Sequence, residues 1–125
     1  MDDLERSKYW LHLGMRMTRQ APGEAEVTLD IGPEHTQALG VVHGGVIASM
    51  ADAAMAVAFS QLAPGEGMST IDLSVRFMRP AVSGRLVATG RVVHTTRSLY
   101  FAEARVLCGE EAVAIAQATF KRFPR

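Results

Sequence analysis

Residues Gly44–Ser60, with the sequence GGVIASMADAAMAVAFS, form the most apolar run in this chain. Alanine and methionine, which recur through the run, favour α-helix. Only Ser49, Asp52 and Ser60 carry polar side chains, so a helix here is apolar almost all the way round. Such a helix must be enclosed on most sides rather than laid on a surface. The run therefore predicts one long helix buried at the centre of the protein.

The sequence on either side of this run predicts mainly β-strands, preceded by a short amphipathic helix over 3–13. The segment 32–43 has no hydrophobic period and is expected to be a loop. Alternating patterns bounded by turn residues predict strands over 15–18, 27–31, 70–77, 85–96, 98–107 and 111–122. In the strand over 70–77, alternation places Ile71, Leu73, Val75 and Phe77 on one face and Thr70, Asp72, Ser74 and Arg76 on the other.

Small residues are concentrated on one face of the last three predicted strands. They are Ala88, Gly90, Ala102, Ala104, Ala112, Ala114, Ala116 and Ala118. A sheet face covered by such small side chains lets a helix approach closely. We therefore expect residues 1–125 to form a single α+β domain, with a curved antiparallel sheet wrapped around one long central helix.

Composition excludes several classes of protein. The chain has 125 residues, which is one domain's worth, and its 13 Lys and Arg balance its 13 Asp and Glu. A neutral balance argues against nucleic-acid binding through a basic surface. The single cysteine, Cys108, allows no internal disulfide, and four histidines without ligand spacing make a metal site unexpected. No signal peptide or membrane span is predicted, so we expect a cytoplasmic location.

Asp52 is the candidate for chemistry. A carboxylate within a buried apolar helix costs several kcal/mol, by rough estimate, unless it is paired, hydrogen-bonded or open to a cavity. Ser49 and Ala56 lie on the same stripe of the helix, and their small size leaves room beside the carboxylate for a ligand. The alternative is a structural aspartate that is satisfied by the backbone or by a hydroxyl.

The helix start offers a second candidate site, His43-Gly44-Gly45. Unpaired N–H groups at a helix N-terminus can polarise a carbonyl, and glycine lets a ligand approach the backbone. His43 alone could also be a metal ligand or a base, although a hydrogen-bonded loop histidine is the simpler interpretation. Asp52 lies eight residues beyond Gly44, or about 12 Å along the helix. If both act on one carbonyl they come from different subunits, which predicts at least a dimer.

These residues resemble a known family. The pattern Gln37-x2-Gly40-x2-His43-Gly44-Gly45-x6-Asp52, followed by Thr70-x-Asp72-Leu73 and Arg79-Pro80, is similar to that of PaaI-like acyl-CoA thioesterases of the hotdog superfamily. The resemblance implies the hotdog fold and hydrolysis of acyl-CoA or aroyl-CoA thioesters without a cofactor. It also implies a homotetramer, a dimer of dimers, with active sites at the subunit interface.

The resemblance implies a role for each matching residue. The Gly44 amide would polarise the thioester carbonyl, and Gln37 would position substrate or water. Asp52 of the partner chain would be nucleophile or general base, and Thr70 would hold the water or the carboxylate. Gln37 beside an aspartate is a mixed pair for the family, and Ala56 lacks a hydroxyl that some relatives carry. The choice between nucleophile and base stays open.

Binding of the substrate involves further candidates. His43 and Gly45 flank the polarising amide, and the CoA phosphates need cations, for which Arg76, Arg79 and Arg97 with its neighbour Ser98 are available at strand ends. The acyl group could be phenyl or aliphatic, since either fits a pocket lined by Met50, Met55, Phe59, Met68 and Met78.

Two other functions remain alternatives. A hotdog acyl-thioester hydratase or dehydratase would share the fold, but the sequence lacks the His-x-Pro type of element that such enzymes use. A non-catalytic acyl-CoA-binding module would leave the buried Asp52 without a purpose. Release of free thiol from CoA thioesters distinguishes all three.

Overall fold

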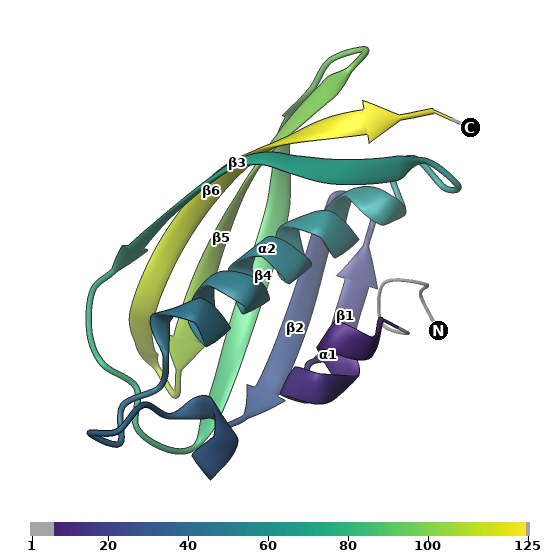
Figure 1. The fold of residues 1–125 in the computed structure, drawn as a ribbon. Coiled ribbons are helices and arrows are strands. Elements are labelled where there is room, and N and C mark those ends of the chain that lie inside the picture. Colours follow the sequence, from purple (N-terminus) through teal and green to yellow (C-terminus); the bar gives the residue numbers. More distant parts are fainter. Residues whose placement is uncertain (1–6, 125) are drawn as a thin grey trace.

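The computed structural model describes residues 7–124. Its elements follow in chain order as α1 (Lys8–Leu13), β1 (Arg16–Ala21), β2 (Glu24–Asp30), the 3-10 turn η1 (Pro33–His35), α2 (Gly44–Ser60), β3 (Gly67–Phe77), β4 (Arg85–Thr95), β5 (Leu99–Cys108) and β6 (Glu111–Phe123). The six strands form one antiparallel sheet in the order β1-β2-β4-β5-β6-β3. Figure 1 shows this sheet curving behind α2, with α1 beside β1. The expected α+β hotdog architecture is confirmed.

The central helix begins and ends where the sequence predicts. Ten of its residues are buried, whereas Ser49, Asp52, Ala56 and Ser60 are half-buried. These four residues follow one another at spacings of three and four, so they form one stripe along the helix. This stripe is less buried than the faces of the helix on either side of it, and it contains Asp52.

Small side chains bring the helix close to the sheet, as expected. Gly90 on β4 makes the tightest approach: a Cβ added there would lie 2.5 Å from the carbonyl carbon and oxygen of Ala54. Seven of the eight predicted small residues are buried beneath the helix, and only Ala112 is half-buried. Alanine and glycine are therefore required here by the spacing between helix and sheet.

The predicted faces of β3 are wrong at Thr70. The register against β6 shifts between Thr70 and Asp72, so Ile71 forms a β-bulge. Thr70 lies opposite Phe120 and Leu73 opposite Ala118, and both partners are buried under the helix. The bulge thus places Thr70 on the helix-facing side together with Leu73, where simple alternation would have placed it on the other face.

Three smaller differences concern segment ends. The predicted helix over 3–13 is seen as α1 from Lys8, and its residues before 7 lie outside the described part of the chain. The predicted loop over 32–43 contains η1 and a bridge between Thr36 and Val42. β3 begins three residues earlier than predicted, at Gly67, because it continues to pair with β6 as far as Phe123.

Candidate active site

Asp52 and Thr70 meet at the middle of α2. The Thr70 hydroxyl donates a hydrogen bond to Asp52 Oδ1 at 2.8 Å. Burial raises the pKa of the Asp52 carboxyl above its ordinary range, and the hydrogen bond from Thr70 lowers it in part. Asp52 has no ion-pair partner among the residues that the structure describes. A half-buried carboxylate with a raised pKa and one hydroxyl partner is suited to take a proton from water or to attack a carbonyl.

A cavity of about 230 Å³ lies beside this pair. It is lined by Tyr9, Trp10, Met15, Ser49, Asp52, Ala53, Ala56, Met68, Thr70 and Phe120. Most of these side chains are apolar, so the cavity is suited to an acyl group whose carbonyl faces Asp52. The small neighbours predicted around Asp52, Ser49 and Ala56, do line this space.

The predicted methionine lining is mostly wrong. Met50, Met55 and Phe59 are buried in the core rather than exposed to the cavity. Phe59 instead stacks on Tyr100, with ring centroids 4.0 Å apart. Of the five predicted lining residues only Met68 borders the cavity. Met50, Met55 and Phe59 point from α2 into the core, and Met78, just after β3, is exposed.

Tyr9 and Trp10 of α1 are among the lining residues that were not predicted from the sequence. Trp10 is buried, whereas Tyr9 is 55% exposed, and the Tyr9 hydroxyl lies 2.6 Å from Ser49 Oγ. The sequence predicted a short amphipathic helix over 3–13, but it gave no indication that this helix packs against α2. The contact spans 40 positions of sequence.

The first turn of α2 forms the other end of the predicted site. No side chain caps this helix at His43, and the first N–H groups of any helix lack acceptors within it. The Gly44 and Gly45 amides are therefore available to a carbonyl oxygen. The ring of Phe77 lies beside Gly44, 3.2 Å from the position that a Cβ would take there.

Gln37 lies in the loop that leads to this turn. Its backbone N–H donates to the Val41 carbonyl at 2.8 Å, and its side-chain oxygen accepts the N–H of Leu39. The loop thus holds Gln37 near the start of α2 through the adjacent bridge between Thr36 and Val42. In this conformation the side-chain amide closes its own turn.

His35 links this loop to α1 and was not singled out in the sequence. Its Nδ1 accepts the Gly32 N–H at 2.9 Å, which places the proton on Nε2, 2.6 Å from the Leu13 carbonyl. The His35 carbonyl in turn accepts the N–H of His43 at 2.9 Å. The buried His35 therefore joins the end of α1 to the residue that precedes α2.

The two halves of the predicted site do not meet within one chain. Gly44, His43 and Gln37 lie at the start of α2, and Asp52 with Thr70 lies at its middle. The eight residues between Gly44 and Asp52 span about 12 Å of helix. One carbonyl group cannot touch both.

The predicted phosphate-binding arginines are also separated. Arg79 follows the end of β3 and forms an ion pair with Glu111 at 2.6 Å. Arg97 and Ser98 lie in the turn between β4 and β5. The Ser98 carbonyl accepts the N–H of Arg122, and Arg122 pairs with Met68 at the start of β3, so this turn lies near the start of β3. Arg79 and Arg97 therefore lie near opposite ends of β3, which is 11 residues long.

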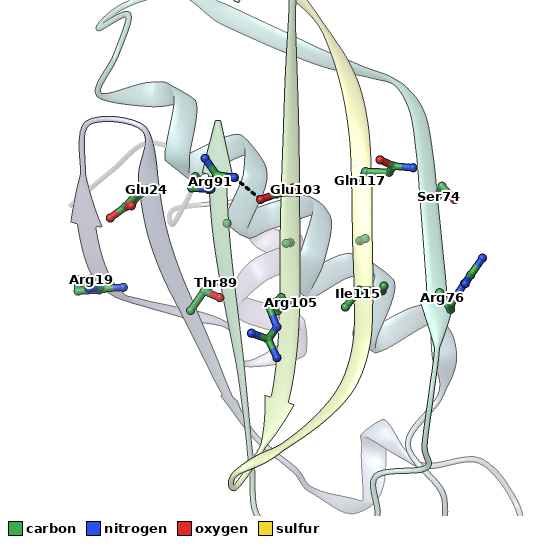
Figure 2. A pocket seen from close by; sticks show the side chains of 13 residues that line it. Arg19, Glu24, Ser74, Arg76, Thr89, Arg91, Glu103, Arg105, Ile115 and Gln117 are labelled. Atoms are coloured by element: carbon green, nitrogen blue, oxygen red, sulfur yellow. Dashed lines mark hydrogen bonds and ion pairs between the residues drawn. The ribbon is translucent and has the colours of Figure 1, made fainter. Parts of the chain in front are cut away.

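A larger hollow of about 640 Å³ lies on the face of the sheet turned away from α2. Figure 2 shows its charged and polar side chains, among them Arg76 and the ion pair between Arg91 and Glu103. None of the residues that line it is Asp52, Thr70, Gln37 or Gly44. We place the candidate active site in the smaller cavity because Asp52 and Thr70 line it.

Within residues 7–124, no group of three or more His, Cys, Asp or Glu side chains is arranged to hold a metal ion. Within the same residues, no helix combines the length and apolar character needed to cross a membrane.

The comparisons with known proteins agree with this geometry. Residues 39–115 match the family model described as the thioesterase superfamily. Human acyl-coenzyme A thioesterase 13 is 30% identical over 82 residues, which cover 65% of this chain and 59% of the human protein. A Mycobacterium tuberculosis protein, named as an unproven esterase, is 36% identical over 89 residues, which cover 68% of this chain and 64% of that protein. The match thus spans less than two thirds of these curated relatives.

A solved structure extends the similarity to almost the whole chain. A single-substitution variant of the phenylacetic acid degradation protein PaaI from Thermus thermophilus superposes with a TM-score of 0.87 and 26% identity, over 94% of this chain and all of that one. Fold and site together define a hotdog protein of thioesterase type. The chain belongs to the thioesterase superfamily and resembles its PaaI-like members.

Proposed function

We propose that this protein hydrolyses acyl-CoA or aroyl-CoA thioesters to the free acid and CoA. The observation that carries the proposal is the half-buried Asp52 carboxylate, with a raised pKa and a hydrogen bond from Thr70, in the wall of a mainly apolar cavity. The family membership of the chain supports the reaction type. No cofactor is needed, because water supplies the hydroxyl and the thiol leaves with one proton.

The residues divide the reaction between them. Thr70 holds Oδ1 of Asp52, which leaves Oδ2 for the water or the thioester carbon. As a base, Asp52 takes a proton from water while the oxygen attacks the carbonyl carbon; as a nucleophile, it forms a mixed anhydride that water then cleaves. In both routes the C–S bond breaks and the thiolate of CoA accepts a proton.

The carbonyl oxygen needs a donor as its negative charge develops. We assign this role to the Gly44 N–H of a second subunit, flanked by Gly45 and His43, with Gln37 positioning substrate or water. The edge strand β3 supports an interface there, because its apolar side chains Ile71 and Phe77 are 57% and 52% exposed in the single chain. A dimer of dimers is the assembly that we propose.

The CoA portion would extend away from the cavity. The candidates for binding its phosphates are Arg79 from one subunit and Arg97 with Ser98 from another. Two subunits are needed because one chain cannot bring these arginines together. Each is exposed and carries its charge at a turn.

The experiment is release of free thiol from a panel of CoA thioesters, with Asp52→Asn as the variant. We expect the wild-type protein to release CoA and the variant to lose at least about 100-fold in kcat, the scale for a positioned base. The isosteric amide keeps the volume and removes a buried charge, so the melting temperature should not fall.

The same assay tests the alternatives. A variant that melts far lower and keeps wild-type kcat would make Asp52 structural. Binding of acyl-CoA without thiol release would indicate a binding module, and addition of water to an enoyl thioester without cleavage would indicate a hydratase.

A further inference from the structure

The peptide group between His43 and Gly44 is held from its carbonyl side. The His43 carbonyl accepts the Val46 N–H at 3.0 Å and the Ile47 N–H at 3.4 Å. A trans peptide is planar, so its N–H points opposite to its carbonyl. The Gly44 N–H therefore points out of the start of α2, and it has no acceptor among residues 7–124. A carbonyl oxygen that binds there depends on the orientation of this one peptide group.

His35, in the loop before α2, holds the other side of His43. The His35 carbonyl accepts the His43 N–H at 2.9 Å. Both peptide groups that flank His43 are thus held by hydrogen bonds, and together they set the direction of the Gly44 N–H. The nearby bridge between Thr36 and Val42 ends one residue before His43, so it does not replace the bond from His35.

The side chain of His35 is buried, with both ring nitrogens in contact with the backbone. It is 4% exposed, and no other histidine, lysine, arginine or acidic side chain among residues 7–124 is buried. Nδ1 accepts the Gly32 N–H at 2.9 Å, and Nε2 lies 2.6 Å from the Leu13 carbonyl. Burying an imidazole costs free energy unless its polar atoms are paired. An apolar side chain would avoid this cost, so these two contacts account for a histidine at this position.

We infer that His35 is a positioning residue that holds the start of α2, so that the Gly44 N–H meets the carbonyl oxygen of the substrate. This inference rests on the proposed thioesterase function. The bond from Gly32 closes the turn η1, from which the His35 carbonyl reaches His43. The contact with Leu13 ties the same turn to the end of α1, the helix that forms one wall of the cavity. His35 itself lines neither the cavity nor the larger hollow, so it acts only through the backbone.

Three variants of His35 separate its two contacts. His35→Leu keeps a similar volume and removes both contacts. It should lower kcat by about 10-fold, because a misaligned donor stabilises the transition state less well. Binding of the substrate should be nearly intact, so KM should stay within about twofold. His35→Asn keeps an amide oxygen near the position of Nδ1 for the Gly32 N–H and should recover most of kcat. His35→Gln keeps only the contact with Leu13 and should lose kcat like His35→Leu.

The matched control is Thr28→Val. Thr28 is likewise a buried polar side chain, and its hydroxyl lies 2.7 Å from Thr18 Oγ1, outside the cavity. Valine keeps the shape and removes this hydrogen bond, so the melting temperature should fall while kcat stays at the wild-type value. The control thus shows what the loss of a buried hydrogen bond does when it affects stability alone.

Hydrogen exchange of the His43 amide, measured by NMR, gives a readout that needs no activity. Compared with a core amide such as that of Val106, it should exchange faster in His35→Leu and at nearly the wild-type rate in His35→Asn. Wild-type kcat in His35→Leu and His35→Gln, at whatever melting temperature, would overturn the inference, and so would an equal loss of kcat in His35→Asn. A wild-type protein that cleaves no CoA thioester would instead contradict the proposed function. The exchange of the His43 amide would then test the positioning by itself, and an unchanged rate in His35→Leu would overturn it.

Discussion

Asp52 combines two opposing influences on its proton. Burial raises its pKa, and the hydrogen bond from Thr70 lowers it. A raised pKa in the folded state means that protonation favours folding below the ordinary aspartate value of about 3.9, and that this advantage is lost as the pH rises through the raised value. At neutral pH the charged Asp52 is therefore a cost to stability, which Asp52→Asn removes.

Thr70→Val tests the second influence. The change keeps the shape of the side chain and removes the donor to Asp52 Oδ1, so the pKa of Asp52 should rise further. In the proposed mechanism the charged carboxylate is the active form, so the acid limb of the kcat/KM profile should move to higher pH, with a lower rate at its plateau. Ser69→Ala, one residue away on the same strand, is the control and should leave the limb in place. An acid limb that does not move would show that Thr70 does not influence the pKa of Asp52.

At the scale of elements, the approach of α2 to β4 depends on one missing methyl group. A Cβ at Gly90 would lie 2.5 Å from backbone atoms of Ala54 and 2.8 Å from the Met55 nitrogen, and backbone cannot move aside as a side chain can. Gly90→Ala should therefore lower the free energy of unfolding by about 1–3 kcal/mol, as measured by urea denaturation.

The matched control for this prediction is Gly45→Ala in the first turn of α2. A Cβ there meets nothing within 4 Å, and alanine is the better helix former, so stability should not fall. Equal midpoints for Gly90→Ala and the wild-type protein would show that the helix can shift away from the sheet.

The elements were predictable where composition alone determines them. The apolar run of α2 and the small residues beneath it required a helix enclosed by a sheet, and both were found. The bulge at Ile71 could not be predicted, because the local alternation of Ile71, Leu73 and Val75 looks regular. Which residue bulges depends on pairing with β6 and on the reach of Thr70 to Asp52, and both are contacts distant in sequence.

The sequence predicted only some of the residues of the candidate site. Asp52 was predictable because it is a charged residue in an apolar helix, and Thr70 only from the family pattern. Tyr9 was not, because its contact with Ser49 depends on where the first helix packs. The acyl-pocket lining failed for the same reason: apolar residues of α2 are chemically alike, and only the packing separates those that face the sheet from those that face the cavity.

At the scale of the whole molecule, the proposed mechanism gives one chain two incomplete half-sites. The start of α2 offers donors for a carbonyl oxygen, and its middle offers the carboxylate, about 12 Å away. A second copy related by a two-fold axis along the exposed strand β3 would bring each half-site against the complementary half of its partner. Each dimer would then contain two complete sites.

Mixing two impaired variants tests this arrangement. Gln37→Ala should lower kcat by about 5- to 150-fold and Asp52→Asn by at least about 100-fold, so each homodimer is impaired. In a mixed dimer one site receives Gln37 from one chain and Asp52 from the other, both intact, and the second site receives both changes. Co-expressed and separately tagged chains should therefore regain about half of the wild-type activity per mixed dimer.

A site formed within one chain predicts a different activity for the mixed dimer. If Gln37 and Asp52 of the same chain served one site, every site in a mixed dimer would carry one change, and the activity would equal the mean of the two impaired homodimers. Dimers of one wild-type chain with one chain that carries both changes provide the control. If sites are shared between chains, each site in such a dimer carries one of the changes. If sites are not shared, the site of the wild-type chain stays intact, and half of the activity remains. Full activity from a monomer of 13.5 kDa in light scattering would reject shared sites altogether.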